Sequence, residues 1–140
     1  MKKTIALVIH ALHYVDMSRR MDDTIAIESL AAMAQPTRLK VFRRLLNAYP
    51  DQIAAGEIAR GCKVPHNTMS AHLAVLTRSG LVVARRAGRM MYYVADLDGF
   101  QSLVGFLMRD CCNGRAEICA PLLADLTGCV PSRKREKSRV

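Results

Sequence analysis

The sequence predicts a mostly α-helical domain that carries one small β-hairpin. Two observations support this fold class: apolar residues recur at helical spacing in five segments, and two short β-prone runs flank a glycine. A third observation is size, because 140 residues of which 51% are hydrophobic suffice for one packed core and little more. We expect one domain over residues 21–126, preceded by an extension over 1–20 and followed by a basic, disordered tail over 127–140.

Two helices are predicted before residue 50. Asp22 and Asp23 precede a segment whose apolar residues fall on one helical face, namely Ile27, Leu30, Ala31 and Ala34. Pro36 is tolerated in a first helical turn and begins a second amphipathic helix that Pro50 ends. The apolar face of this second helix comprises Leu39, Phe42, Leu45, Leu46 and Tyr49.

Two further helices are separated by a tight turn. A short helix is expected from about Ala55 to Gly61, with Ile58 and Ala59 facing inward. Pro65 then begins a fourth helix, and Gly80 is placed to cap its end. The inward face of this fourth helix repeats at helical spacing through Met69, Leu73 and Leu76.

A hairpin and a fifth helix complete the domain. The runs 81–86 and 90–94 are separated by Ala87, Gly88 and Arg89, which is typical of a hairpin turn. Asp96 is placed to cap a fifth helix that extends to about Asp110. One apolar stripe of this helix comprises Leu97, Phe100, Val104, Leu107 and Met108, and a second comprises Leu103 and Phe106. The second side predicts contact with a partner subunit, although burial inside one monomer is an alternative.

The order helix, helix, helix, hairpin, helix is the plan of a winged helix-turn-helix. Between Ile58 and Ala95 there are six basic residues and no acidic one, as contact with phosphates requires. The outward face of the fourth helix offers hydrogen-bonding groups for DNA, from His66, Asn67, Thr68, Ser70 and His72. The hairpin offers Arg85, Arg86 and Arg89. Two alternatives remain open: His72 orients the helix or meets a phosphate, and Thr68 and Ser70 satisfy backbone groups.

Three cysteines follow the fifth helix within nine residues, Cys111, Cys112 and Cys119. Soft thiolates without a histidine or carboxylate pattern favour a thiophilic ion, and three sulfurs suit pyramidal trivalent arsenic or antimony better than zinc. In an unbroken helix Cys112 and Cys119 would lie about 10 Å apart along the axis. We therefore expect Asn113 and the following Gly114 to turn the chain back. We also expect the nearby Arg115 to lower the pKa of the thiols.

Three segments resemble the ArsR/SmtB family of metalloregulatory repressors: residues 34–42 (AQPTRLKVF), 64–76 (VPHNTMSAHLAVL) and 80–89 (GLVVARRAGR). The resemblance covers about residues 22–126 and implies a homodimer that binds operator DNA and dissociates when an inducer binds. The three-cysteine pattern resembles the C-terminal arsenic site of a subgroup of arsenic-responsive repressors. The family's other arrangement, a Cys-x-Cys-x-x-Cys run, is absent, since its positions are Ala54, Gly56 and Ala59.

The remaining cysteines and the N-terminus predict a cytoplasmic protein. Five cysteines are an odd number, which favours free thiols in a reducing compartment, with Cys62 and Cys129 structural or incidental. Lys2 and Lys3 before an apolar run at 5–15 imitate a signal peptide, but the run is too short to cross a membrane. The extension is then a leader or the result of a mis-assigned start, with Met17 and Met21 as the alternatives.

Other functions remain open. A repressor of the same fold that senses redox state through a Cys119 disulfide to Cys111 or Cys112 would use the same residues. A thiol-dependent arsenate reductase is disfavoured, because the sequence has neither a glycine-rich phosphate loop nor a Cys-x5-Arg loop, and we expect no enzymatic activity. A third alternative is an interaction module that uses the fold only as a scaffold.

Overall fold

A computed structural model describes residues 21–113 and 115–126, without the side chain of Cys111. The chain divides into two compact units, Met1–Phe106 and Leu107–Val140, and each is described by itself. The extension expected over 1–20 and the tail expected over 127–140 lie outside the described residues. No helix in the described ranges is long and apolar enough to cross a membrane.

Helix α2 (Asp23–Met33) begins where the acidic residues predict, because the Asp22 side chain accepts a hydrogen bond of 2.9 Å from the Ile25 N–H. The apolar face that the sequence indicates is not the face buried within this unit. Ala26, Ser29 and Ala32 face the core, whereas Ile27 is 65% exposed and Leu30 is 42% exposed. Small residues allow α2 to pack closely, and the Ser29 hydroxyl donates to the Ser79 carbonyl at 3.1 Å. The larger apolar side chains are therefore left at the surface of this unit.

Helix α3 (Pro36–Ala48) begins at the proline, and the Gln35 side chain accepts from the Arg38 N–H at 2.8 Å. Its buried residues are Val41, Phe42 and Leu45. Tyr49, predicted on the apolar face, lies beyond the helix end and is 47% exposed. The Phe42 ring packs on Phe100, with ring centroids 5.3 Å apart.

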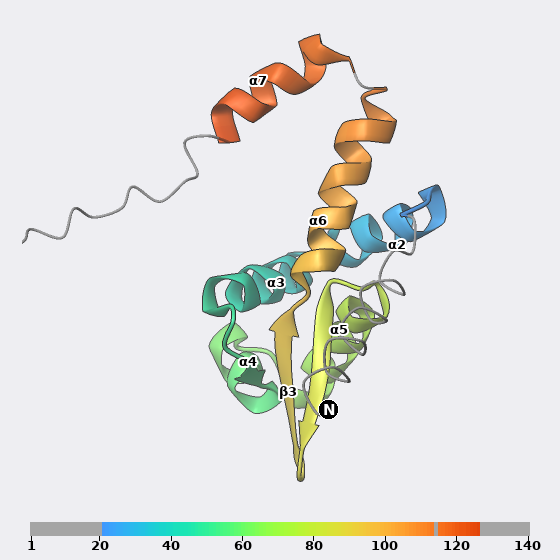
Figure 1. The fold of residues 1–140 in the computed structure, drawn as a ribbon. Coiled ribbons are helices and arrows are strands. Elements are labelled where there is room, and N and C mark those ends of the chain that lie inside the picture. Colours follow the sequence, from blue (N-terminus) through green and yellow to red (C-terminus); the bar gives the residue numbers. More distant parts are fainter. Residues whose placement is uncertain (1–20, 114, 127–140) are drawn as a thin grey trace, which may run out of the picture. The chain divides into compact units, whose positions relative to one another are not determined.

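Helices α4 (Ala55–Cys62) and α5 (His66–Arg78) form the predicted helix-turn-helix (Figure 1). The turn between them is made by Lys63, whose φ of 56° is left-handed and ends α4. Gly80 follows α5 with a φ of 77°, which confirms the predicted glycine cap. Ile58, Met69 and Leu73 are among the most buried side chains of the unit and join the two helices to one core.

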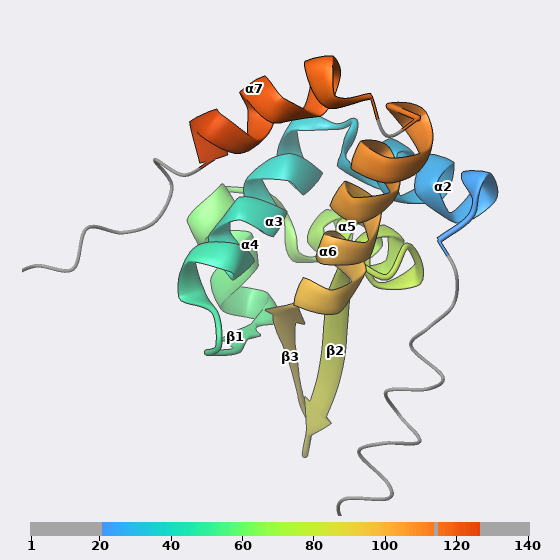
Figure 2. The same ribbon diagram turned by 45° about the horizontal axis from the view of Figure 1, so that its top comes forward.

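The hairpin pairs β2 (Val82–Ala87) with β3 (Met90–Ala95), and Gly88 in the turn has a φ of 60°. A third strand, β1 (Ile53–Ala54), was not predicted. It pairs antiparallel with β3, Ile53 opposite Tyr93, so the strand order is β1-β3-β2 (Figure 2). The hairpin tip extends beyond the helices as a wing (Figure 1).

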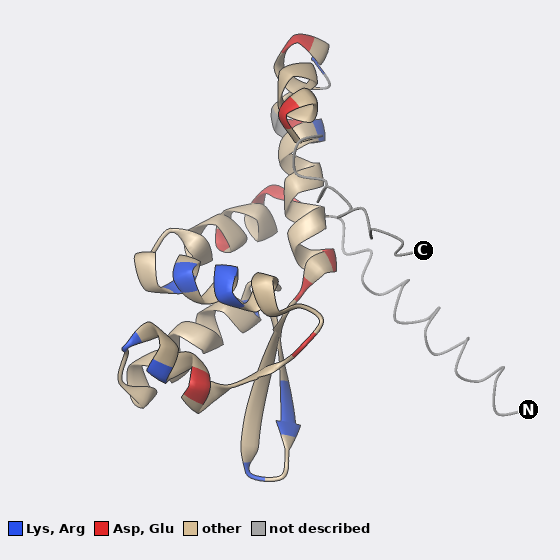
Figure 3. Ribbon diagram, turned by 90° about the vertical axis from the view of Figure 1, so that its left-hand side faces the viewer, with Lys and Arg blue, Asp and Glu red and all other residues tan. Residues whose placement is uncertain are grey.

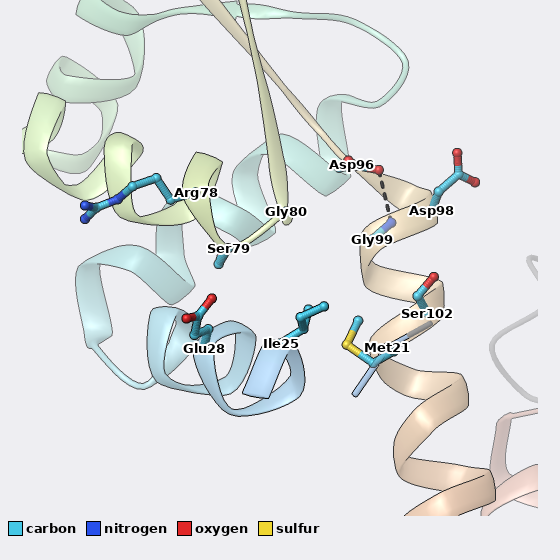
Figure 4. Close-up of a pocket in the computed structure, with 10 residues that line it drawn as sticks. All are labelled: Met21, Ile25, Glu28, Arg78, Ser79, Gly80, Asp96, Asp98, Gly99 and Ser102. Atoms are coloured by element: carbon cyan, nitrogen blue, oxygen red, sulfur yellow. Dashed lines mark hydrogen bonds between the residues drawn. The ribbon is translucent and has the colours of Figure 1, made fainter. Parts of the chain in front are cut away.

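Helix α6 (Leu97–Phe106) begins at the predicted cap, since the Asp96 side chain accepts from the Gly99 N–H at 3.1 Å (Figure 4). Of its two apolar stripes, Leu103 and Phe106 are buried in the core, whereas Val104 is 38% exposed. Beside the start of α6 lies a pocket of about 250 Å³ that α2 and the end of α5 also line (Figure 4).

The second unit starts with a change of helix type. The fifth helix was predicted to run to Asp110 as one α-helix, but residues Leu107–Cys111 form a π-helical turn, η1. Helix α7 (Ala116–Leu126) follows and has no buried residue. A π-turn pairs each N–H with the carbonyl five residues back, so the register of backbone hydrogen bonds changes in the segment that ends at Cys111, directly before Cys112.

Candidate DNA-binding surface and cysteine site

Helix α5 separates its two faces as the sequence predicts. Met69, Leu73 and Leu76 are at most 1% exposed. Of the five predicted DNA-reading residues, His66, Asn67, Thr68 and Ser70 are exposed and His72 is half-buried. The buried face fixes the helix on the core, because apolar contact holds its rotation. The polar face is therefore held in a fixed orientation toward solvent.

The N-terminus of α5 is free to meet an anion. Its cap residue is Pro65, and no side chain accepts a hydrogen bond from the first N–H groups. Unpaired N–H groups and the helix dipole together favour a phosphate at this end. Ser70 is different from its neighbours, because its hydroxyl donates to the His66 carbonyl at 3.0 Å. This bond supports the alternative that Ser70 satisfies the backbone.

The wing carries the predicted arginines. Arg85, Arg86 and Arg89 are exposed, and basic residues colour the end of β2 and the hairpin turn (Figure 3). Arg86 Nε donates to the Gly88 carbonyl at 3.1 Å, which holds its side chain along the turn. Arg85 and Arg89 form no ion pair within the part of the chain that the structure describes. Their charge is thus available to a polyanion.

Two further basic residues lie at the helix-turn-helix turn. Arg60 and Lys63 are exposed, and with Pro65 and His66 they line a hollow beside the start of α5. The sequence shows their charge but not their place in the site. The signal that identifies them is the turn itself, because Lys63 ends α4 and so lies next to the first turn of α5.

The helix before the turn is held by Arg44. This side chain forms an ion pair of 3.7 Å with Glu57 and lies over Gly61, where a Cβ would approach its guanidinium to 2.4 Å. A side chain at residue 61 would therefore displace the flexible end of Arg44 at this contact between α3 and α4. The contact joins α3 to α4, the helix that precedes the turn to α5.

Two of the three predicted ligand cysteines lie together within the second unit. Asn113 adopts a left-handed φ of 51°, and the Arg115 N–H donates to the Cys112 carbonyl at 3.0 Å, which confirms the predicted turn. Cys119 Sγ donates to the Met108 carbonyl at 3.5 Å. Desolvation, followed by the hydrogen bond and charge of Cys119, raises the pKa of the Cys112 thiol.

The predicted role of Arg115 is wrong. Its guanidinium donates to Glu117 at 2.7 and 2.9 Å and so is neutralised locally. Arg115 is not among the causes that act on Cys112, whose pKa is raised rather than lowered. A Glu two residues away competes for the arginine more strongly than a protonated thiol does.

Three further cysteines are Cys62, Cys111 and Cys129. The side chain of Cys111 and all of Cys129 lie outside the described residues, and the described part holds no group of three candidate metal ligands. Cys62 is a free thiol and 7% exposed in the core of the first unit. It packs as a small apolar residue, in agreement with the structural role expected for it.

Comparison with known proteins decides the class of this protein. Residues 33–85 match the family described as a helix-turn-helix domain. The transcriptional activator HlyU of Vibrio cholerae is 29% identical over 88 residues, which are 63% of this chain and 79% of HlyU. A solved structure described as a possible transcriptional regulator for arsenical resistance is 30% identical, covers 56% of this chain and 79% of its own, and has a TM-score of 0.51.

The chain is a winged helix-turn-helix transcriptional regulator. The fold is also that of a homodimeric winged helix-turn-helix domain from Mycobacterium bovis, 23% identical over 78% of this chain and 92% of its own, with a TM-score of 0.51. These comparisons confirm the predicted fold class. They also confirm that the regulator is not an enzyme, because its homologues are transcriptional regulators.

Proposed function

We propose that the regulator is an arsenite-responsive repressor that binds operator DNA as a homodimer and leaves it when trivalent arsenic or antimony binds Cys111, Cys112 and Cys119. The observation that carries this proposal is the turn at Asn113, which brings Cys119 back to Cys112. Cys111 is the chain neighbour of Cys112, so the third sulfur is close in sequence. The likeness to a possible regulator of arsenical resistance supports the choice of ligand.

The DNA contacts follow from the exposed face of α5. In this proposal His66, Asn67 and Thr68 enter the major groove first, because the N-terminal end of a recognition helix leads. Asn67 is suited to a bidentate contact with adenine, and His72 and Ser70 complete the face. Arg85, Arg86 and Arg89 contact the backbone or the minor groove, and this role is supported by their exposure and by the lack of acidic partners among the described residues.

The dimer is proposed to form through apolar residues that the first unit leaves exposed. Ile27 and Leu30 on α2 and Val104 on α6 are large, apolar and exposed, and α2 and α6 contact each other within this unit. A two-fold axis through such a face places two recognition helices side by side, as half-sites one DNA turn apart require. The homodimeric structural neighbour supports the same assembly.

Arsenite binding is proposed as a balanced exchange of ligands. Arsenous acid has three hydroxyl groups; each thiol displaces one of them, an As–S bond forms and an As–O bond breaks. The thiol proton leaves with the hydroxide as water, so three thiols release three waters. The chemistry needs reduced thiols, and a reducing cytoplasm supplies them.

Two measurements test the ligand set. Reduced full-length protein should bind one arsenic per chain in equilibrium dialysis, and each of Cys111→Ser, Cys112→Ser and Cys119→Ser should weaken binding at least tenfold. Cys129→Ser is the matched control and should bind like the unchanged protein. Equal binding by all four variants would refute the proposed triad.

Transcription from a template with the operator, with and without the protein, tests repression against activation.

A second candidate function uses the same pair of cysteines. Because Cys112 and Cys119 interact directly, a peroxide can join them as a disulfide: two thiols and one peroxide give one disulfide and two waters. A redox sensor would release DNA on peroxide treatment and keep it when arsenite is added under excess reductant. An arsenite sensor gives the opposite result, so the two conditions separate the candidates.

A further inference from the structure

The Cys119 thiol has a contact that no ligand role requires. Its sulfur donates to the carbonyl of Met108, 11 residues earlier, at 3.5 Å. Met108 lies in the π-turn η1, while Cys119 lies in the first turn of α7. The hydrogen bond therefore joins two helical segments on either side of the turn at Asn113.

The carbonyl at Met108 needs such a donor. Carbonyls in the last turn of a helix have no partner within the helix, and η1 ends at Cys111. Cys119 is half-buried, although α7 has no buried residue, so its sulfur is the part of α7 most withdrawn from solvent. The thiol hydrogen is thus used to satisfy a backbone group at the end of the helix.

We infer that the Cys119–Met108 hydrogen bond, here called the latch, stabilises the π-turn η1 in the free regulator. We also infer that this bond breaks, and the latch opens, when the Cys119 sulfur binds a thiophilic centre. The reason is that the bond depends on the S–H hydrogen. When an As–S bond replaces the S–H bond, the hydrogen leaves in water and Met108 faces a sulfur that only accepts. The first half of this inference stands without the proposed function; the second half rests on it.

The latch involves η1, which follows directly on α6 in the chain. Residue 107 follows directly on α6, whose Leu103 and Phe106 are 1% and 8% exposed in the core of the DNA-binding unit. A π-turn is much rarer than an α-helical turn, which indicates that it depends on added contacts. Opening the latch therefore loosens η1, the segment that follows directly on α6 in the chain.

Two variants at Cys119 separate the latch from a role as ligand only. Cys119→Ser removes the sulfur and keeps a donor for Met108, whereas Cys119→Ala removes both. In reduced, arsenite-free full-length protein, the carbonyl-carbon NMR shift of Met108 should stay in place for Ser and move for Ala. DNA binding should be about two- to fivefold weaker for Ala than for Ser, the effect of one net hydrogen bond. Cys112→Ser and Cys112→Ala are matched controls and should behave alike, because Cys112 does not bond Met108.

Arsenite added to the unchanged protein provides the second arm. The Met108 carbonyl shift should move in the same direction as in Cys119→Ala. If Ser and Ala at residue 119 give the same shift and the same DNA affinity, the latch is refuted whatever arsenite does. If arsenite binds without moving the Met108 shift, opening on ligand binding is refuted. If arsenite does not bind, the proposed function fails, and the Ser and Ala pair still decides the latch.

Discussion

Gly99 of α6 lies directly against the carbonyl of Gly80, so that a Cβ on Gly99 would come within 1.9 Å of that oxygen. Gly80 connects the end of α5 to β2 and has a left-handed φ. The close approach lets α6 pack where the recognition helix and the wing meet (Figure 4). The placement of α5 relative to α6 thus depends on the absence of a side chain at residue 99.

Gly99→Ala should lower the free energy of unfolding by about 2 to 4 kcal/mol, because both neighbouring backbones must move. Urea unfolding followed by circular dichroism measures the change. Gly56→Ala is the matched control, since a Cβ there would meet only the flexible end of Arg60 at 3.4 Å. That variant should be as stable as the unchanged protein or slightly more so, because alanine favours the helix. Equal stability of both variants would show that the Gly99 contact is relaxed in solution.

Arg89 at the wing turn should contribute to DNA binding through its charge alone. Arg89→Ala should weaken binding to operator and unrelated DNA alike, and reduce the slope of log K against log salt by about 0.9. Fluorescence anisotropy over a range of salt concentrations measures this slope. Arg78→Ala removes the same charge at the opposite end of α5 and should leave the slope unchanged. A loss of slope for Arg78 equal to that for Arg89 would contradict the proposed orientation.

Asn67 and Ser70 should differ sharply in DNA recognition. The Ser70 hydroxyl already donates to the His66 carbonyl, whereas the exposed Asn67 side chain has no bond to another part of the described chain. Asn67→Ala should cost about five- to 150-fold in operator affinity, as loss of a bidentate base contact does. Ser70→Ala should cost less than about twofold. Gel-shift titrations at one salt concentration test the pair, and the reverse order of effects would be evidence against this assignment.

The alkylation of Cys112 should report the effect of Cys119 on its pKa. Desolvation and the neighbouring Cys119 raise the pKa of Cys112, so less thiolate is present at neutral pH than for an ordinary cysteine. The rate of iodoacetamide modification, followed by mass spectrometry, should therefore rise at a higher pH than for a free thiol. Cys119→Ala removes two of the three causes and should shift the profile of Cys112 toward lower pH. An unchanged profile would mean that the two thiols do not interact in solution.

Much of the fold could be predicted because proline, glycine and capping residues mark its boundaries. Pro36, Asp96 and Gly80 each act where the sequence predicts. Strand β1 was missed because two residues carry no periodicity, and it exists only through pairing with β3. The apolar face of α2 is not its buried face, because Ile27 and Leu30 are apolar but are not covered within the first unit. An apolar pattern identifies a face to be buried, without showing whether the same chain buries it.

The candidate site was predictable in part for the same reasons. The two faces of α5 and the turn at Asn113 follow from spacing and from glycine and asparagine chemistry. The π-turn at 107–111 was not predictable, because its hydrogen-bond register has no sequence signature. The ion pair between Arg115 and Glu117 does not follow from the cysteine pattern, because a carboxylate two residues away competes with the thiols for the arginine.

The most direct test of the account is the release of operator DNA by arsenite under excess reductant, followed by fluorescence anisotropy of labelled DNA. Coupling of about 1 to 3 kcal/mol predicts that saturating arsenite weakens DNA binding about five- to 150-fold, and that DNA weakens arsenite binding by the same factor. The variant Cys112→Ser should keep its DNA under the same conditions. Unchanged DNA affinity in saturating arsenite, with the protein fully reduced and arsenite bound, would contradict the account.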